Sequence, residues 1–302
     1  MVWAYRLLLN REPESPEAIA QHLAACGSVE QLRNGFLASS EFRANNPLHP
    51  GFTPESTVVL AEPCDGLRVF VDLSDVSIGL NVARGVYEPH ETAFVRSIVK
   101  PGDSVLDVGA NIGFFTTLMA SLVGPDGNVV AFEPVPQNLR LLRRTIVENG
   151  FEDRIRLLEA AVGEEPGEAH LIHLPLEAGA LNSGGSYLQQ DRKIPEKHEI
   201  VTAPLLKLDE LDLPRPVRFI KIDIEGAEPL AFRGGRELLR ADKPTILCEI
   251  NSIQLERVAN TNANAFLSEM RDLGYECIEL AEGRLGRTIT QLDDALVNVV
   301  FR

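Results

Sequence analysis

The sequence predicts an α/β protein built on a doubly wound, mostly parallel sheet, and three observations predict it. Strand and helix patterns alternate from residue 104 to residue 280. The strand at 104–108 is apolar, as in sheets covered by helices on both faces, and a glycine turn leads from it into a helix. Acidic residues close several strands, at the sheet edge where such folds bind ligands.

The predicted elements follow in chain order. A strand at 67–73 alternates in polarity, and a helix at 88–100 ends at Pro101 and Gly102. The alternation then gives strands at 104–108, 128–133, 155–161, 168–174, 217–223, 244–250, 275–280 and 295–301, with helices at 114–123, 136–149, 226–240 and 262–273. Residues 175–198 contain several glycines and little periodicity, which predicts a loop over the site.

Two domains joined by a linker are expected along the chain. Residues 1–46 read as a small helical accessory domain, with Ser15 as the cap and Pro16 as the first residue of one helix. Residues 47–66 begin with a segment rich in Pro, Gly and Asn and are predicted to be a linker. Residues 67–302 form the α/β domain, which carries the candidate site.

Composition excludes some classes of partner. The net charge of −15 over 302 residues disfavours nucleic acid and anionic membrane surfaces. No apolar stretch approaches the ~20 residues that span a bilayer, and the apolar start is too short for a signal peptide. We therefore expect a cytoplasmic protein without membrane insertion. The four cysteines are far apart and form no C-x-x-C metal pair.

The glycine turn points to one kind of nucleotide ligand. Its pattern places Asp107, Gly109 and Gly113 where dinucleotide sites have three closely spaced glycines. Asp107 would repel a pyrophosphate but suits an ammonium group or a sulfonium. Glu133 closes the next strand, about where such sheets bind ribose hydroxyls. Together these features predict S-adenosylmethionine as the cofactor.

The expected cofactor contacts follow from this placement. The backbone of the turn should approach the methionine moiety, and Asp107 should hold its ammonium group directly or through water. Asn111 and Thr116 are candidates for further polar contacts, although Thr116 also suits an ordinary first helical turn. The turn near Ala161 should flank the adenine. The predicted contacts from this reasoning are Asp107, Gly109, Ala110, Asn111, Gly113, Thr116, Glu133 and Ala161.

Acidic residues at two later strand ends are the candidates for chemistry on an acceptor. Asp223 and Glu249 end neighbouring strands and could face one cavity, with Glu225 close by. A hydroxyl acceptor needs a general base or a metal ion to lose its proton. Mg²⁺ held by Asp223 and Glu249 is one way to balance these charges; the sulfonium or a cationic acceptor is another. Glu228 suits either the site or a helix cap.

His90 is the best-placed histidine and a further candidate base. It lies beside Glu88 and Glu91, ahead of the first parallel strand, and imidazole titrates near neutral pH. A lone histidine at a helix start is also common as an exposed or structural residue. Both interpretations stay open from the sequence.

Several segments together resemble the FkbM family of S-adenosylmethionine-dependent methyltransferases. They occur in the family's order at residues 87–92, 107–113, 132–134, 161–163, 220–228 and 249–250. The most specific is the Lys-Ile-Asp-Ile-Glu-Gly-Ala-Glu run that begins at Lys221. The resemblance implies a Rossmann-like seven-stranded sheet with an antiparallel last strand, and it adds Glu88 and Pro134 to the cofactor site. It also implies O-methylation of sugars, polysaccharides or polyketide-type natural products.

The first 46 residues resemble a small helical domain related in pattern to phycobilisome linkers. The matching segments are residues 5–13 and 36–42. Such modules accompany glycan-modifying enzymes, which favours a glycan or small-molecule acceptor. The resemblance also suggests that this domain binds a protein partner or a second copy of the chain.

The main hypothesis is therefore O-methyl transfer to a sugar or glycan hydroxyl. An N-methyltransferase or a polyketide-type natural-product methyltransferase on the same fold is the first alternative. A non-catalytic nucleoside-binding scaffold is the second, although Asp107, Glu133 and Asp223 are all retained. An NAD-dependent oxidoreductase is the third, and the missing middle glycine counts against it.

Overall fold

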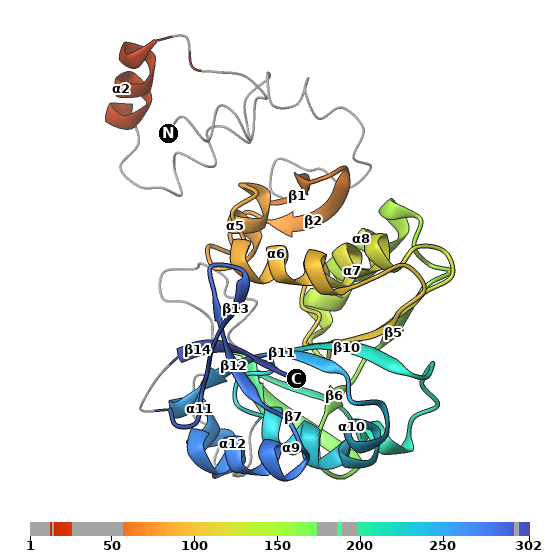
Figure 1. Cartoon of the computed structure of the whole chain (residues 1–302). Helices are drawn as coiled ribbons and strands as arrows, with labels where there is room; N and C mark the ends of the chain where they lie inside the picture. The colour runs from red at the N-terminus through yellow and green to blue at the C-terminus, as the bar shows by residue number, and fades with distance from the viewer. Residues whose placement is uncertain (1–12, 14, 26–56, 174–185, 189–198, 293–295) are drawn as a thin grey trace.

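The computed structural model describes residues 13, 15–25, 57–173, 186–188, 199–292 and 296–302 (Figure 1). Helix α2 (Pro16–Ala25) begins where the Ser15 and Pro16 signal predicts a helix. The other helices expected before residue 47 lie outside the described residues. In the described part of the chain, no helix combines the length and the apolar character needed to cross a bilayer.

The centre of the molecule is an eight-stranded sheet. Its members in chain order are β3 (Ser104–Val108), β4 (Asn128–Phe132), β5 (Ile155–Leu158), β10 (Val217–Ile222), β11 (Thr245–Asn251), β12 (Cys277–Ala281), β13 (Arg284–Thr288) and β14 (Leu296–Phe301). They are arranged β13-β12-β14-β11-β10-β3-β4-β5. Strand β14 runs antiparallel to both β11 and β12. The expected seven strands with an antiparallel last strand are confirmed, and β13 adds an eighth.

Helices cover both faces of this sheet, as the apolar strands predict (Figure 1). One layer contains α6 (Pro89–Ile98), α7 (Phe114–Val123) and α8 (Pro136–Asn149); the other contains α9 (Glu228–Gly234), α10 (Arg236–Asp242), α11 (Ser252–Ala259) and α12 (Ala263–Asp272). Successive strand residues point to opposite faces, so Val105 joins one apolar core and Leu106 the other. These two cores fix the sheet and hold its carboxyl edge in place.

The strand order creates a crevice at that edge. Strands β4 and β5 lie on one side of β3 in the sheet, whereas β10 and β11 lie on its other side. The parallel register aligns Val108 with Ile222 and Asp107 with Lys221. The loops after β3 and β10 thus leave the sheet at the same level. This is the switch point at which open α/β sheets bind ligands.

A small hairpin corrects the predicted linker at 47–66. Strand β1 (Val58–Cys64) pairs antiparallel with β2 (Leu67–Asp72), and Asp65 and Gly66 between them both have positive φ. The Phe70 amide donates to Thr145 Oγ1 of α8 at 3.0 Å, so the hairpin packs on the α/β domain. A short helix, α5 (Gly79–Ala83), follows β2. The latter part of the predicted linker therefore belongs to that domain.

A second sheet of four strands follows β5. It contains β6 (Ala161–Val162), β7 (Gly167–His173), β8 (Ser186–Leu188) and β9 (Glu199–Leu206) in the order β6-β9-β7-β8. The predicted strand at 155–161 is thus divided into β5 and β6. Strand β8 lies inside the predicted loop at 175–198, and β9 was not predicted. Its Pro204, opposite Glu168, is a residue that weakens a strand signal.

The predicted helix at 226–240 is also divided, into α9 and α10. The division falls at Gly234 and Gly235, where a Cβ on Gly234 would lie 2.1 Å from the Gly163 carbonyl oxygen. Helix α11 and the 3₁₀ turn at Leu208–Glu210 were not predicted. Cys64, Cys248 and Cys277 are free thiols, as their spacing implies.

Candidate functional site

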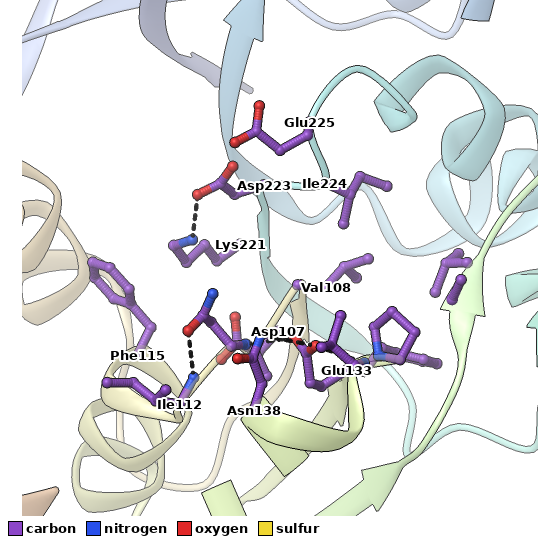
Figure 2. Close-up of a pocket in the computed structure, with 18 of the residues that line it drawn as sticks. Asp107, Val108, Ile112, Phe115, Glu133, Asn138, Lys221, Asp223, Ile224 and Glu225 are labelled. Carbon is purple, nitrogen blue, oxygen red and sulfur yellow. Dashed lines mark hydrogen bonds and ion pairs between the residues drawn. The ribbon is translucent and has the colours of Figure 1, made fainter. Parts of the chain in front are cut away.

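A cavity of about 280 Å³ opens at the carboxyl ends of β3, β4, β10 and β11 (Figure 2). It joins the two groups of residues that the sequence assigned to cofactor and acceptor. Most of the predicted residues line it, namely Glu88, Asp107, Gly109, Ala110, Asn111, Glu133, Pro134, Ala161, Asp223, Glu225 and Glu249. The structure therefore brings the separate strand-end carboxylates into one site.

The glycine turn after β3 is shaped by close packing of the backbone. The Gly109 and Ala110 amides both donate to the Phe132 carbonyl oxygen, at 3.0 and 2.9 Å. Gly109 has φ +90°, and a Cβ there would lie 2.1 Å from the Asp223 carbonyl oxygen. Only glycine lets the two loops approach so closely. This contact places the cofactor turn directly beside Asp223.

Asp107 is fully buried at the floor of the cavity. Thr116 donates a hydrogen bond from Oγ1 to Asp107 Oδ2 at 2.5 Å, so Thr116 supports the carboxylate instead of lining the cavity itself. Asp107 Oδ1 has no hydrogen-bond partner among the described residues. Burial raises the pKa of Asp107, and Lys221 and Thr116 oppose that rise. An incoming ammonium group would satisfy the unpaired oxygen.

Glu133 organises the opposite side of the turn. Its carboxylate accepts from the Asn111 amide at 2.8 Å, the Val135 amide at 2.9 Å and Asn138 Nδ2 at 3.2 Å. Burial nonetheless raises its pKa to about 7. A carboxylate has about four acceptor positions, so one remains for a ligand hydroxyl. This geometry is compatible with the predicted ribose contact.

Besides Thr116, two predicted residues lie outside the cavity lining. Gly113 has φ +93° before α7, and a Cβ there would lie 2.4 Å from Leu142 Cδ1. It is therefore required for helix packing, not for approach to a ligand. His90 is exposed in the first turn of α6 and does not line the cavity. The structure does not bring it together with the other candidate catalytic residues.

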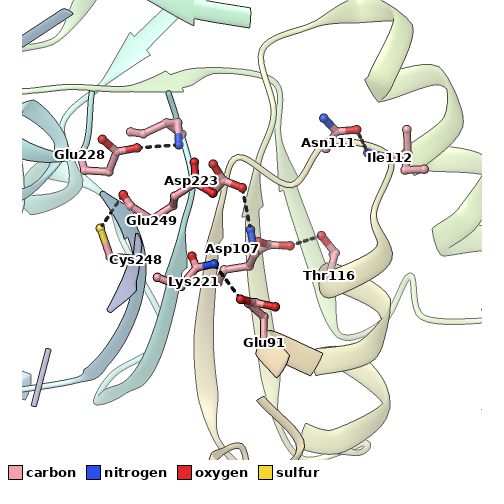
Figure 3. A network of polar contacts seen from close by, with 12 residues as sticks. Glu91, Asp107, Asn111, Ile112, Thr116, Lys221, Asp223, Glu228, Cys248 and Glu249 are labelled. Atoms are coloured by element: carbon pink, nitrogen blue, oxygen red, sulfur yellow. Dashed lines mark hydrogen bonds and ion pairs between the residues drawn. The ribbon is translucent and has the colours of Figure 1, made fainter. Parts of the chain in front are cut away.

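The other end of the cavity, predicted to receive the acceptor, carries Asp223 and Glu249 (Figure 3) and Glu225 (Figure 2). Burial, followed by the charges of Asp223 and Glu228, raises the pKa of Glu225 to about 7. Burial and the charges of Asp223, Glu225 and Glu88 raise the pKa of Glu249 to about 8. These glutamates can exchange a proton near neutral pH. That property suits a general acid or base.

Backbone strain marks the same region. Glu88 and Glu225 have φ of +41° and +51°, in the left-handed region that side chains other than glycine and asparagine seldom adopt. Asn111, also in the lining, has φ +50°. Such residues persist where surrounding contacts hold them, and they cluster at functional sites.

Glu228 holds the loop that carries Glu225. Its Oε1 accepts from the Ile224 amide at 2.9 Å and the Gly226 amide at 3.3 Å. Gly226 has φ +95°, and a Cβ there would lie 2.4 Å from the Gln254 carbonyl oxygen. Glu228 is buried and does not line the cavity. The sequence allows Glu228 to be either part of the site or a structural residue at the helix start, and these contacts support the structural role.

The predicted metal site gains no support. Among the described residues, no three His, Cys, Asp or Glu side chains converge as metal ligands. Asp223 instead lies beside the ammonium group of Lys221, whose Nζ is 3.4 Å from Asp223 Oδ2. The positive charge next to Asp223 thus comes from the chain itself.

Several lining residues were not singled out by the sequence. Tyr87 and Phe115 flank Lys221 and the carboxylates, and Leu171 and Leu188 reach the cavity from the four-stranded sheet. For Lys221 the sequence does predict pairing with Asp223, which follows it by two residues, and the structure confirms the pair. No signal in the sequence places Leu188 at the cavity, because its position depends on pairing between β7 and β8.

Known proteins resemble part of this chain. It is 31% identical over 127 residues to a protein-L-isoaspartate O-methyltransferase of Methanopyrus kandleri, covering 39% of this chain and 55% of that protein. It is 30% identical over 172 residues to the 31-O-demethyl-FK506 methyltransferase FkbM of Streptomyces tacrolimicus, covering 49% and 64%. The chain thus spans between half and two thirds of these relatives.

One solved structure is also similar, and a family model shows the family. The crystal structure of methyltransferase FkbM from Methylobacillus flagellatus aligns with a TM-score of 0.40 and 18% identity, over 76% of this chain and 55% of that one. The model of the methyltransferase FkbM domain matches residues 107–277, more than half of the chain. The matched range contains the glycine turn and the acidic strand ends that form the cavity. The chain therefore belongs to the FkbM methyltransferase family.

Proposed function

We propose that this protein is an S-adenosylmethionine-dependent O-methyltransferase acting on a hydroxyl of a sugar, a glycan or a related natural product. The observation that carries the proposal is the single cavity with two chemically different ends. One end is the glycine turn with the buried Asp107 and Glu133. The other carries Asp223, Glu225 and Glu249 on the next strands. Donor and acceptor bound at these ends would be neighbours, which is the main requirement for group transfer.

The cofactor end fits the chemistry of S-adenosylmethionine. The unpaired Oδ1 of Asp107 suits the ammonium group, and Glu133 has acceptor capacity for a ribose hydroxyl. Glu88 and Asn111 line the same end, and Pro134 and Ala161 offer apolar surface for the adenine. When bound, the cofactor supplies a methyl group on a positively charged sulfur, which is already activated for transfer.

The acceptor end supplies the proton chemistry. As the acceptor oxygen bonds to the methyl carbon, the bond between that carbon and sulfur breaks and its electron pair stays on sulfur. The hydroxyl proton passes to a carboxylate, and Glu249 is the best candidate because its pKa of about 8 suits proton transfer near neutral pH. Asp223 orients the hydroxyl as a hydrogen-bond acceptor. Glu225 adds negative charge beside them.

The lining also limits the acceptor. It carries six carboxyl side chains and, among the described residues, one basic side chain. A phosphorylated or otherwise anionic acceptor would be repelled, whereas a neutral polyol is compatible. Leu171, Leu188 and Ile224 offer apolar contacts of the kind that the C–H face of a sugar can use. A macrolide-type hydroxyl is the second candidate, favoured by the similarity to the 31-O-demethyl-FK506 methyltransferase.

Other sequence predictions remain part of this proposal. The N-terminal helical domain would recruit a protein partner or a second copy of the chain, and the enzyme would act in the cytoplasm. The role of the N-terminal domain rests on the resemblance of residues 1–46 to a small helical domain that accompanies glycan-modifying enzymes.

The test uses S-adenosylmethionine with a trideuterated methyl group and mass spectrometry of the acceptor. The panel contains neutral oligosaccharides, uronic-acid oligosaccharides, a macrolide alcohol, a primary amine and an isoaspartyl peptide, each with Mg²⁺ and with EDTA. We expect label on a neutral hydroxyl, loss of labelling in Asp223→Asn, and unchanged binding of S-adenosylhomocysteine in that variant. Label on the amine or the peptide alone, or full activity of Asp223→Asn, would contradict the proposal.

A further inference from the structure

The cavity contains a buried lysine whose position is unusual for a structural residue. Lys221 is 5% exposed and lies in the middle of the parallel sheet, paired in register with Asp107 of β3. Its Nζ is 3.4 Å from Asp223 Oδ2 and 4.8 Å from the centroid of the Phe115 ring (Figure 2). It therefore stands between the cofactor end and the acceptor end of the cavity.

A buried ammonium group is costly unless its charge is compensated. Replacing a buried ion pair with apolar residues of similar volume is often neutral or stabilising, so stability alone does not explain why one is present. Here the compensation comes from three elements: Asp107 on β3, Asp223 after β10 and Glu88 before α6. Tyr87 is hydrogen-bonded to Glu88. The lysine thus connects carboxylates from both ends of the site.

Lys221 is suited to hold charge and not to take up a proton. Burial alone would lower the pKa of Lys221. The carboxylates of Asp223, Glu88 and Asp107 raise it by a larger amount, so the net change is upward. The group stays an ammonium ion at neutral pH and cannot act as a base. Its stacking on Phe115 adds a cation–π contact that fixes its position.

We propose that Lys221 is a positioning residue for methyl transfer: its ammonium group fixes the Asp223 carboxylate toward the acceptor hydroxyl and supplies the positive charge that a metal ion would otherwise supply there. The proposal rests on the proposed function. Asp223 without this partner would face Glu88, Glu225 and Glu249 with no compensating cation from the lining. It would then turn away or take up a proton, and the acceptor hydroxyl would lose its orientation.

The activity test compares Lys221→Met, which keeps the length of the side chain without its charge, with Lys221→Arg, which keeps the charge. Lys207→Met, at a partly exposed lysine paired with Glu165 and away from the cavity, is the control. We expect Lys221→Met to lower kcat about 10–100-fold while the Kd for S-adenosylhomocysteine changes less than about threefold, because the lost charge is not one that binds the cofactor. Lys221→Arg should recover part of kcat, and Lys207→Met should match the wild type.

Two results would overturn the proposal. Loss of S-adenosylhomocysteine binding in parallel with kcat would place Lys221 in the cofactor site, and full kcat in Lys221→Met would remove it from the transfer step. If Lys221→Met does not fold, Lys221→Met combined with Glu88→Gln removes one charge of each sign and is compared with Glu88→Gln alone, because Glu88 lines the cofactor end. If that variant also fails to fold, Lys221→Arg decides: a lower kcat with unchanged binding of S-adenosylhomocysteine supports positioning, and loss of cofactor binding contradicts it.

The pairing itself is measured without an acceptor, so failure of the proposed function would be seen separately. Urea unfolding is followed for the wild type, Lys221→Met, Asp223→Asn and the double variant. We expect Asp223→Asn to raise the unfolding midpoint in the Lys221→Met background and not in the wild-type background. Equal shifts in both backgrounds would show that the two side chains are not coupled.

Discussion

At the scale of single residues, the site is defined by carboxyl groups, several of which have pKa values raised by burial. Asp107 and Glu133 could be predicted from the sequence, because a carboxylate at the end of a parallel strand has only one edge of the sheet to face. Lys221 could not be assigned in the same way. Its role depends on Glu88, Asp107 and Phe115, which come from three other elements of the fold.

Glu133 carries the first prediction. Its pKa is raised to about 7, so it is largely protonated at pH 6 and ionised at pH 8. The ionised form accepts hydrogen bonds, so S-adenosylhomocysteine should bind more tightly at pH 8 than at pH 6, and binding at pH 6 should release a proton. Glu133→Gln should weaken binding about 10–100-fold at pH 8, or about 1.4–2.8 kcal/mol, and remove the pH dependence.

Calorimetry in buffers of different ionisation enthalpy measures both the affinity and the released proton. Glu148→Gln is the control, since Glu148 is paired with Arg68 away from the cavity. Wild-type affinity that does not change between pH 6 and pH 8 would contradict the role given to Glu133.

At the scale of elements, local signals were enough where packing is regular. The bounds of α7 and α8 agree with the sequence prediction, because apolar periodicity and proline or glycine at their ends mark them. The division between α9 and α10 could not be predicted, because it depends on the Gly163 carbonyl oxygen, distant in sequence. Strand β8 was missed for a similar reason, since it needs β7 as a partner.

The turn between β3 and α7 gives the second prediction. Gly113→Ala would place a Cβ on a residue with positive φ and within 2.4 Å of Leu142 Cδ1. The variant should therefore lose about 2–4 kcal/mol of stability. Leu142→Ala in the same chain should relieve the clash, so the double variant should lose less stability than the two single losses combined.

Urea unfolding measures these differences. Gly150→Ala is the matched control, since Gly150 is also left-handed, with φ +64°, but has nothing within 4 Å of a new Cβ. It should cost only about 1 kcal/mol. Equal losses for Gly113→Ala and Gly150→Ala would show that contact with Leu142 does not select glycine.

At the scale of the whole molecule, acidic charge is concentrated at the carboxyl edge of the sheet. Glu133, Glu225 and Glu228 have pKa values raised to about 7, and that of Glu249 is raised to about 8. Between about pH 4.5 and pH 8 the folded protein holds protons that the unfolded chain has lost. The free energy of unfolding should therefore fall as pH rises through this range.

This third prediction is measured as the urea midpoint at pH 5.5 and pH 8 without cofactor. The midpoint should be higher at pH 5.5. Glu228→Gln keeps an acceptor for the Ile224 and Gly226 amides but has no charge, so the difference between the two pH values should become smaller. A wild-type midpoint that is equal at both pH values, or higher at pH 8, would be inconsistent with buried carboxyl groups of raised pKa.

The central claim is that one cavity at this sheet edge binds an adenosyl ligand with a cationic tail. The most direct measurement is calorimetric titration of the wild-type chain with S-adenosylhomocysteine, with NAD titrated in parallel. We predict saturable binding of one S-adenosylhomocysteine per chain and none of NAD, because the buried Asp107 carboxyl group would repel a pyrophosphate bound at the glycine turn. Binding of NAD, or of neither ligand, would contradict it.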